Sequence, residues 1–207
     1  MDRTERGKFC GNYGWYFLVT WLPFYLVRER DFSMNRMARI GGSAYLFAAV
    51  FATLSGWLSD RWIAKGGTPT RVRKTFMFVG YACAGISLIL CVVSGHYLFV
   101  ALLMVASASF GIYASNTWAI AQTLAGPQAA GKWTGVQNFV ANLAGVVVPA
   151  LTGFIVERTG RFFWAFAITA IVALLGAIFW VFVVGPVKQV VWAREFLALS
   201  KTAVHSA

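Results

Sequence analysis

The feature that most constrains this chain is the length of its uncharged, apolar stretches. Residues 133–156 and 162–184 contain no Asp, Glu, Lys or Arg. Each stretch exceeds the roughly 20 residues that an α-helix needs to cross about 30 Å of hydrocarbon. Only 12% of the 207 residues are charged, against roughly 25% in ordinary soluble domains. We therefore predict an all-α membrane protein.

Six membrane-spanning helices can be drawn along the sequence. Helices are expected rather than the strands of a barrel, because the runs are continuously apolar and do not alternate at every second residue. The connecting segments are charged or contain Gly and Pro, as loops outside hydrocarbon do. The approximate limits of the six helices are 10–27, 40–59, 75–94, 97–123, 133–156 and 162–184.

The formal net charge of +11 raises the question of nucleic-acid binding. The Lys and Arg residues, however, lie in short blocks between apolar stretches rather than along one soluble face, so we expect no nucleic-acid partner. More of these residues fall on the segments that share a side with the N-terminus. By the positive-inside rule, we expect a multi-pass protein of the inner (plasma) membrane with both termini in the cytoplasm. Residues 191–207 would then form a cytoplasmic tail.

The sequence lacks the residue groupings that catalysis or metal binding needs. Cys10, Cys83 and Cys91 show no CxxC spacing, and His96 and His205 have no Cys, Ser or Asp partner in a recurring arrangement. All seven acidic residues lie outside the predicted helices or at their ends, so no helix centre offers a carboxylate for a proton or Na⁺. We expect no enzyme, no metal site and no cofactor.

Three of the predicted helices carry polar side chains on one face. Such groups can be satisfied by bonding across helices, which is ordinary in membrane bundles, but Asn and Gln amides are harder to satisfy alone. Three polar faces among six helices favour a shared hydrated cavity for a polar organic solute. The sets in the first, fourth and fifth helices are Tyr13, Tyr16 and Thr20; Gly111, Ser115, Trp118 and Gln122; and Gly135, Asn138, Asn142, Gly145 and Pro149.

A charged motif marks the end of the second predicted helix. Gly56 is followed by Asp60 and Arg61, and then by a basic block at 71–74. An acid at this place can cap a neighbouring helix N-terminus, while the basic residues stay on the cytoplasmic side. The motif resembles the loop motif of the major facilitator superfamily, which occurs between helices 2 and 3 and, in weaker form, between helices 8 and 9. The insertion at 62–70 fits the weaker copy.

Two longer stretches resemble one family of that superfamily, the anion:cation symporters. Residues 9–26 (FCGNYGWYFLVTWLPFYL) resemble its helix 7, and residues 115–155, which begin SNTWAIAQT, resemble its helices 10 and 11. The family includes bacterial hexuronate, galactonate and tartrate carriers, and vesicular glutamate and sialic acid transporters. The resemblance implies that residues 1–190 are the C-terminal half of a twelve-helix carrier, built as two inverted three-helix repeats.

The resemblance also implies a function. The complete carrier would transport small organic anions, such as hexuronate or galactonate, by alternating access with cation-coupled symport. The sites for the coupled H⁺ or Na⁺, and the basic residue that neutralises the substrate carboxylate, belong mainly to the N-terminal half of the family. The substrate-site residues implied here are Ser115, Thr117, Trp118 and Asn138, with Tyr13, Tyr16 and Gln122 on the same cavity and Gly56, Asp60 and Arg61 in the gating loop.

The sequence does not determine what such a half-carrier assembles with. Besides the lipid bilayer and the organic anion, its partner could be an N-terminal six-helix half or a second copy of the chain. Alternatively, the chain could be a truncated or split-gene half-transporter with no transport activity of its own, acting as an assembly subunit or a non-functional fragment.

Overall fold

The computed structural model describes residues 3–190, which form six helices and no strand. This confirms the all-α prediction. Several helices run beyond the apolar stretches into charged sequence, where water can solvate their ends. The helices are α1 (Arg3–Arg28), α2 (Met34–Ala64), α3 (Pro69–Val93), α4 (His96–Asn142), α5 (Ala144–Thr159) and α6 (Phe163–Phe182).

Within the described residues, four helical stretches are long and apolar enough to span a membrane, namely Met34–Ala64, Pro69–Val93, His96–Thr159 and Phe163–Phe182. The chain is thus a multi-pass membrane protein. Helix α1 falls outside this set because Asn, Gly, Tyr and Trp residues lower its hydropathy. The predicted count of six spans, and the two-repeat arrangement, therefore remain predictions.

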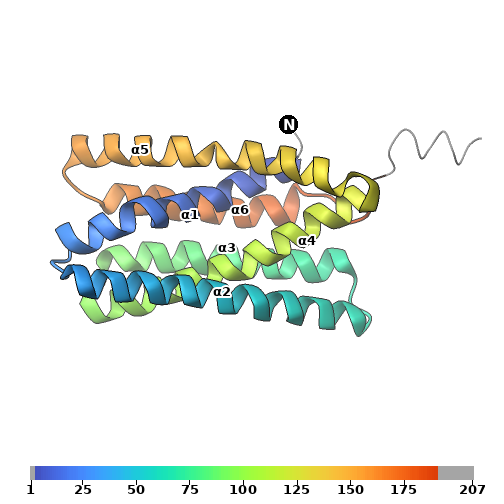
Figure 1. Cartoon of the computed structure of the whole chain (residues 1–207), viewed down its shortest axis with the longest axis horizontal. Coiled ribbons are helices and arrows are strands. Elements are labelled where there is room, and N and C mark those ends of the chain that lie inside the picture. Colours follow the sequence, from blue (N-terminus) through green and yellow to red (C-terminus); the bar gives the residue numbers. More distant parts are fainter. Residues whose placement is uncertain (1–2, 191–207) are drawn as a thin grey trace, which may run out of the picture.

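The stretch His96–Thr159 is 64 residues long but is not one straight helix. Gly126 interrupts α4 with φ 68° and ψ 172°, a conformation that glycine adopts far more readily than other residues. Pro127 follows and has no backbone N–H to continue the helical bonding. Figure 1 shows the chain reversing its direction at the end of the bundle between the labels α4 and α5. The break lies within the Gly/Pro segment that the sequence placed between the fourth and fifth predicted helices.

Helix packing places α4 against both α2 and α3, α3 against α6, and α1 against α4, α5 and α6. In Figure 1 the helices run along the long axis of the molecule, with α5 and α2 at opposite sides. Gly111 permits the contact between α4 and α2, because a Cβ at this position would overlap the carbonyl oxygen of Ala48.

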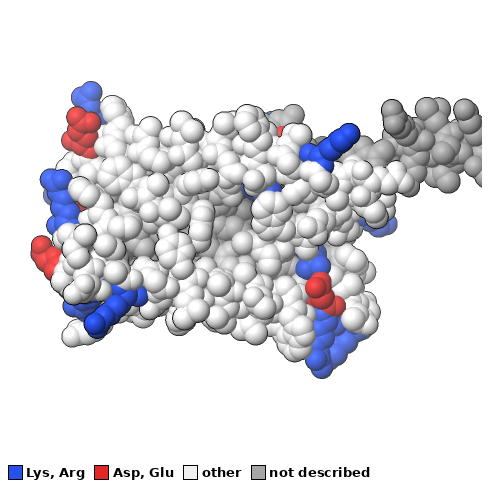
Figure 2. All heavy atoms as spheres, in the orientation of Figure 1, with Lys and Arg blue, Asp and Glu red and all other residues white. Residues whose placement is uncertain are grey.

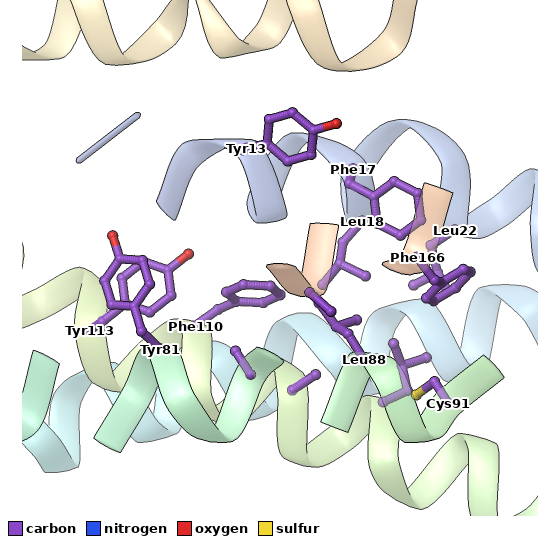
Figure 3. Close-up of a cluster of buried hydrophobic side chains, with 14 of the residues drawn as sticks. Tyr13, Phe17, Leu18, Leu22, Tyr81, Leu88, Cys91, Phe110, Tyr113 and Phe166 are labelled. Atoms are coloured by element: carbon purple, nitrogen blue, oxygen red, sulfur yellow. The ribbon is translucent and has the colours of Figure 1, made fainter. Parts of the chain in front are cut away.

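The buried core fixes how α1 is rotated about its axis. Figure 3 shows the rings of Tyr81 in α3 and Tyr113 in α4 lying together; they are stacked, with their centroids 4.2 Å apart. The Tyr81 hydroxyl donates to the carbonyl of Gly7 (2.8 Å), and the Tyr113 hydroxyl donates to that of Gly11 (2.7 Å). A Cβ at residue 11 would lie 2.5 Å from the Tyr81 hydroxyl. Glycine therefore lets both tyrosines hold α1 in one orientation.

Charged side chains gather at the two ends of the molecule. Figure 2 shows Lys, Arg, Asp and Glu at both ends and a largely uncharged middle on the face it draws. At one end, Arg30 donates to the carbonyls of Cys91 (3.0 Å) and Ser94 (2.9 Å), which closes the C-terminus of α3. This distribution suits a bundle whose middle lies in hydrocarbon and whose ends lie in water.

Candidate functional site

A cleft between α1, α2 and α4 holds the residues that best fit a binding site. It has a volume of about 370 Å³, and a neighbouring cavity of about 60 Å³ shares four of its residues. We call the two together the central cleft. Figure 2 shows a hollow in the uncharged middle of one face of the bundle. The lining residues are Lys8, Asn12, Trp15, Tyr45, Ala48, Ala49, Ala52, Tyr81, Phe110, Gly111, Tyr113, Ala114, Thr117 and Trp118.

The lining of the central cleft has an apolar part and a polar part. Small side chains of α2, at Ala48, Ala49 and Ala52, form one wall. Trp15 of α1 and Tyr45 of α2 form an aromatic edge, with their ring centroids 5.5 Å apart and nearly perpendicular. The remaining polar side chains come from α1 and α4, apart from Tyr81 of α3. The cleft therefore combines an apolar wall, which can pack a carbon skeleton, with a polar end, which can bind oxygen atoms.

The polar end contains a buried cation. Lys8 is only 4% exposed, and its Nζ atom lies 3.8 Å from the centroid of the Trp118 ring. This atom has no hydrogen-bond partner among the described residues. Burying an ammonium group costs several kcal/mol, whereas a desolvated cation–π contact contributes about 2 kcal/mol. The central cleft thus contains a basic side chain whose Nζ atom forms no hydrogen bond with the described residues.

Asn12 lies one helical turn after Lys8 and is held in place by the last residue of α4. Its Nδ2 atom donates to Oδ1 of Asn142 at 3.2 Å. The Tyr16 hydroxyl donates to the same oxygen at 2.8 Å. Asn142 therefore joins two polar residues of α1 to the C-terminal end of α4 and fixes the Asn12 amide beside the cleft. The fifth predicted helix reaches the site through this residue.

Two residues predicted for the substrate site line the central cleft. Trp118 borders both of its parts, and Thr117 borders the smaller one. The Thr117 hydroxyl donates to the carbonyl of Tyr113 at 2.8 Å, so it is satisfied within α4. Ser115 is half-buried and turned towards α2, where its hydroxyl lies 2.9 Å from that of Ser55. Thr117 and Trp118 thus border the same cavity, whereas Ser115 contacts α2.

Four other predicted residues do not line the central cleft. Tyr13 is 4% exposed and belongs to the hydrophobic core, because five residues along a helix rotate it well away from the face of Lys8. Tyr16 is bonded to Asn142, Asn138 is half-buried, and Gln122 is exposed. A role for these four residues in substrate binding remains a prediction.

The loop motif forms a second polar cluster near the cleft. Arg73 of α3 donates to Oδ1 of Asp60 at 2.6 Å, to the hydroxyl of Ser59 at 2.6 Å and to Oδ1 of Asn116 at 3.1 Å. We call these four residues the Arg73 cluster. Asn116 and Ser59 are completely buried. The cluster therefore connects the loop motif to the helix segment that carries Ser115, Thr117 and Trp118.

The other members of the predicted loop motif lie around this cluster. Gly56 faces Ser115, and a Cβ on it would lie 3.8 Å from the Ser115 Cβ. The Arg61 guanidinium lies over the ring of Trp57, 5.2 Å from its centroid. Gly56 and Asp60 are thus close to the helix segment with the predicted substrate residues, while Arg61 is bound to its own helix.

Sequence reasoning missed Lys8, Asn12 and Asn142 as members of one site. Lys8 lies two residues before the first predicted helix, which begins at residue 10, whereas the structure buries it. The available signal was the spacing of Lys8, Asn12 and Trp15, which places a cation, an amide and an aromatic ring on one helical face. Their contact residues Trp118 and Asn142 are more than a hundred residues away in the sequence, so no local pattern predicts these contacts.

Comparison with known proteins bears out the resemblance found in the sequence. The family model described as Major Facilitator Superfamily matches residues 7–203. The D-galactonate transporter of Escherichia coli O6:H1 is 32% identical over 199 residues, covering 92% of this chain and 45% of the relative. The Bacillus subtilis hexuronate transporter is 31% identical and covers 84% and 42%, respectively. The chain thus spans less than half the length of these relatives.

Solved structures show the same fold at low sequence identity. A peptide transporter in complex with alafosfalin superposes with a TM-score of 0.74 at 16% identity, covering 99% of this chain and 44% of that one. The inward-open xylose transporter XylE from E. coli gives a TM-score of 0.65 at 16% identity, covering 89% and 46%. The relatives and neighbours named here are transporters rather than enzymes, as expected from the sequence.

Proposed function

The chain belongs to the major facilitator superfamily, and we propose that it supplies one half of a carrier that moves small organic anions across a membrane by alternating access. The names of the similar proteins support this substrate class, because they include D-galactonate, hexuronate and galactarate/D-glucarate transporters. In this proposal the described helices form two inverted three-helix repeats, and the coupled H⁺ or Na⁺ binds on the N-terminal half.

The central cleft is the observation that carries the proposal. Its polar end offers the Lys8 ammonium and the Asn12 amide, and its opposite wall offers alanine and aromatic side chains. A sugar acid has a carboxylate, several hydroxyls and a short carbon chain. The cation and amide can bind the oxygen atoms, while the apolar wall packs against carbon–hydrogen faces.

A second candidate is a half-transporter without activity of its own. It is favoured by the central cleft, which is hollowed into one face of the bundle. In an isolated monomer, the central cleft would lack the wall that an N-terminal half or a second copy supplies.

Uptake into proteoliposomes tests both candidates. The purified chain would be reconstituted alone and together with the N-terminal half of the E. coli D-galactonate transporter, and uptake of labelled D-galactonate and D-galacturonate would be measured. Uptake only with both halves is the expected result. Saturable uptake by the chain alone would favour a homodimer. Failure of either preparation to bind or transport any organic anion would contradict the proposed function.

The proposed orientation, with both termini in the cytoplasm of a plasma membrane, is tested by labelling. Single cysteines would replace the exposed residues Asn35, Lys65 and Thr159 in a variant without the native cysteines. A membrane-impermeant maleimide should label positions 35 and 159 in intact cells and position 65 only after the membrane is opened. Labelling of position 65 in intact cells would reverse the orientation.

A further inference from the structure

We propose that Lys8, Asn12 and Trp118 form a subsite for one carboxylate group, so that this half of the carrier itself selects organic anions over neutral sugars. The inference rests on the proposed function and deepens it. The resemblance assigns neutralisation of the substrate mainly to the other half of the family. The structure instead places an unneutralised cation in the cleft of this chain.

The environment of Lys8 sets it apart from other cations in the described part of the chain. Lys74 donates to the backbone carbonyls of Val181, at 3.0 Å, and Val184. Arg30 likewise donates to two carbonyls at the end of α3. Lys8 is 4% exposed, yet its Nζ atom lies over the face of Trp118 and has no hydrogen-bond partner among the described residues. A buried charge with unused hydrogen-bond donors is unfavourable unless a ligand completes it.

The geometry provides donors for both oxygens of a carboxylate. An ammonium has three N–H donors, and the ring face of Trp118 uses none of them in a conventional hydrogen bond. The Asn12 amide has two N–H donors, of which one is bonded to Asn142. Lys8 and Asn12 are one turn apart on the same face of α1 and border the same small cavity. A carboxylate between them would accept from both.

The backbone around the subsite is held rigidly. The carbonyls of Gly7 and Gly11, which flank Lys8 on α1, accept hydrogen bonds from the buried hydroxyls of Tyr81 and Tyr113. Asn142, the last residue of α4, fixes the Asn12 amide. The subsite is therefore preorganised, and little side-chain or backbone freedom is lost when a ligand binds.

The charge of the lining limits the ligand to one carboxylate at this wall. Of the described residues that border the central cleft, Lys8 alone carries a formal charge. Beyond it lie Ala48, Ala52 and the aromatic edge of Trp15 and Tyr45. A monocarboxylate such as an aldonate or a uronate thus has its charge at Lys8 and its carbon chain along the apolar wall. A second carboxylate would need a cation elsewhere.

Binding measurements on Lys8→Met test the subsite. The full chain, in lipid nanodiscs together with the N-terminal half of the E. coli D-galactonate transporter, would be titrated with D-galactonate and with neutral D-galactose. Loss of a hydrogen bond to a charged ligand weakens affinity by about ten- to a hundredfold. We expect that loss for D-galactonate with Lys8→Met, an unchanged affinity for D-galactose, and no change for either ligand with the exposed Lys65→Met.

A second measurement avoids any effect of substitution on folding. The unmodified chain would be treated with a small amine-reactive ester, and the acylation of each lysine would be followed by peptide mass spectrometry. Saturating D-galactonate should slow acylation of Lys8 several-fold and leave that of Lys65 unchanged. D-Galactose at the same concentration should protect neither residue.

The outcomes separate the subsite from the proposed function. If D-galactonate binds and is transported but neither depends on Lys8 nor protects it, the subsite is wrong and the proposed function stands. If Lys8→Met unfolds the chain and D-galactonate gives no protection, Lys8 is a structural residue. If the unmodified chain binds no organic anion with the N-terminal half present, the proposed function fails and the subsite fails with it.

Discussion

Two buried cations of this protein, Arg73 and Lys8, lie in contrasting surroundings. The Arg73 side chain is 11% exposed and donates hydrogen bonds to Ser59, Asp60 and Asn116. Lys8 is 4% exposed and forms no hydrogen bond through its Nζ atom within the described part of the chain, and this atom lies over the Trp118 ring. The first cation is ion-paired and hydrogen-bonded by its own chain, whereas the second has no such partner among the described residues.

The contrast distinguishes a stabilising cluster from a binding site. Removing a bonded cation leaves buried partners unsatisfied and destabilises the fold. Removing an unbonded buried cation takes away an unfavourable charge, so the fold gains stability while the ligand loses its partner. The two sites should therefore respond in opposite directions to the same kind of substitution.

The largest effect is expected for Arg73→Met. The substitution leaves Oδ1 of the buried Asn116 without its donor and removes the charged bonds to Ser59 and Asp60. We expect the free energy of unfolding to fall by about 2–4 kcal/mol, measured by denaturant titration in detergent micelles. Arg71→Met, at an exposed position two residues earlier, should change it little. Equal effects of the two variants would show that the Arg73 cluster contributes nothing to stability.

Lys8→Met should change stability in the opposite direction. Methionine fills similar space without a charge, so the free energy of unfolding without ligand should rise by about 1–3 kcal/mol. The same titration checks this, with Lys65→Met as the matched exposed control. A clear decrease would mean that Lys8 has a structural role, and the contrast with Arg73 would disappear.

A smaller effect is expected for Asn142→Ala. Asn12 and Tyr16 would lose the oxygen that accepts from both, and the free energy of unfolding should fall by about 1 kcal/mol. The affinity for D-galactonate should also fall several-fold, because the Asn12 amide is no longer held. Asn138→Ala is the comparison, since the sequence favoured Asn138 as the substrate contact. A greater loss of affinity with Asn138→Ala than with Asn142→Ala would show that Asn138 is the substrate contact.

The smallest effect on stability is expected for Asp60→Asn. The Asp60 side chain is 68% exposed, so its ion pair with Arg73 is screened by water, and the free energy of unfolding should fall by less than about 1 kcal/mol. Transport should slow while the affinity for D-galactonate is kept, because Asp60 lies outside the lining of the central cleft. Equal losses in affinity and transport rate would place Asp60 in the substrate site.

The sequence by itself determined the helical class and the membrane setting. Uncharged runs such as 162–184 leave few alternatives in hydrocarbon, because every backbone group must be bonded within the chain. The Gly126–Pro127 pair marked a chain reversal through backbone preferences that are also local. The stretch that begins at Ser115 indicated the family, which the comparisons confirmed. All of these signals act over neighbouring residues.

The tertiary structure alone decided which polar groups meet. Helical spacing places Lys8 and Asn12 on one face, but it does not say towards which helix that face is turned. The rotation of α1 about its axis is fixed by hydrogen bonds from the hydroxyls of Tyr81 and Tyr113, which belong to other helices. The same rotation turns Tyr13 into the core and brings Lys8 against Trp118. These contacts depend on packing between distant segments, because a side chain's partner is fixed only when whole helices have docked.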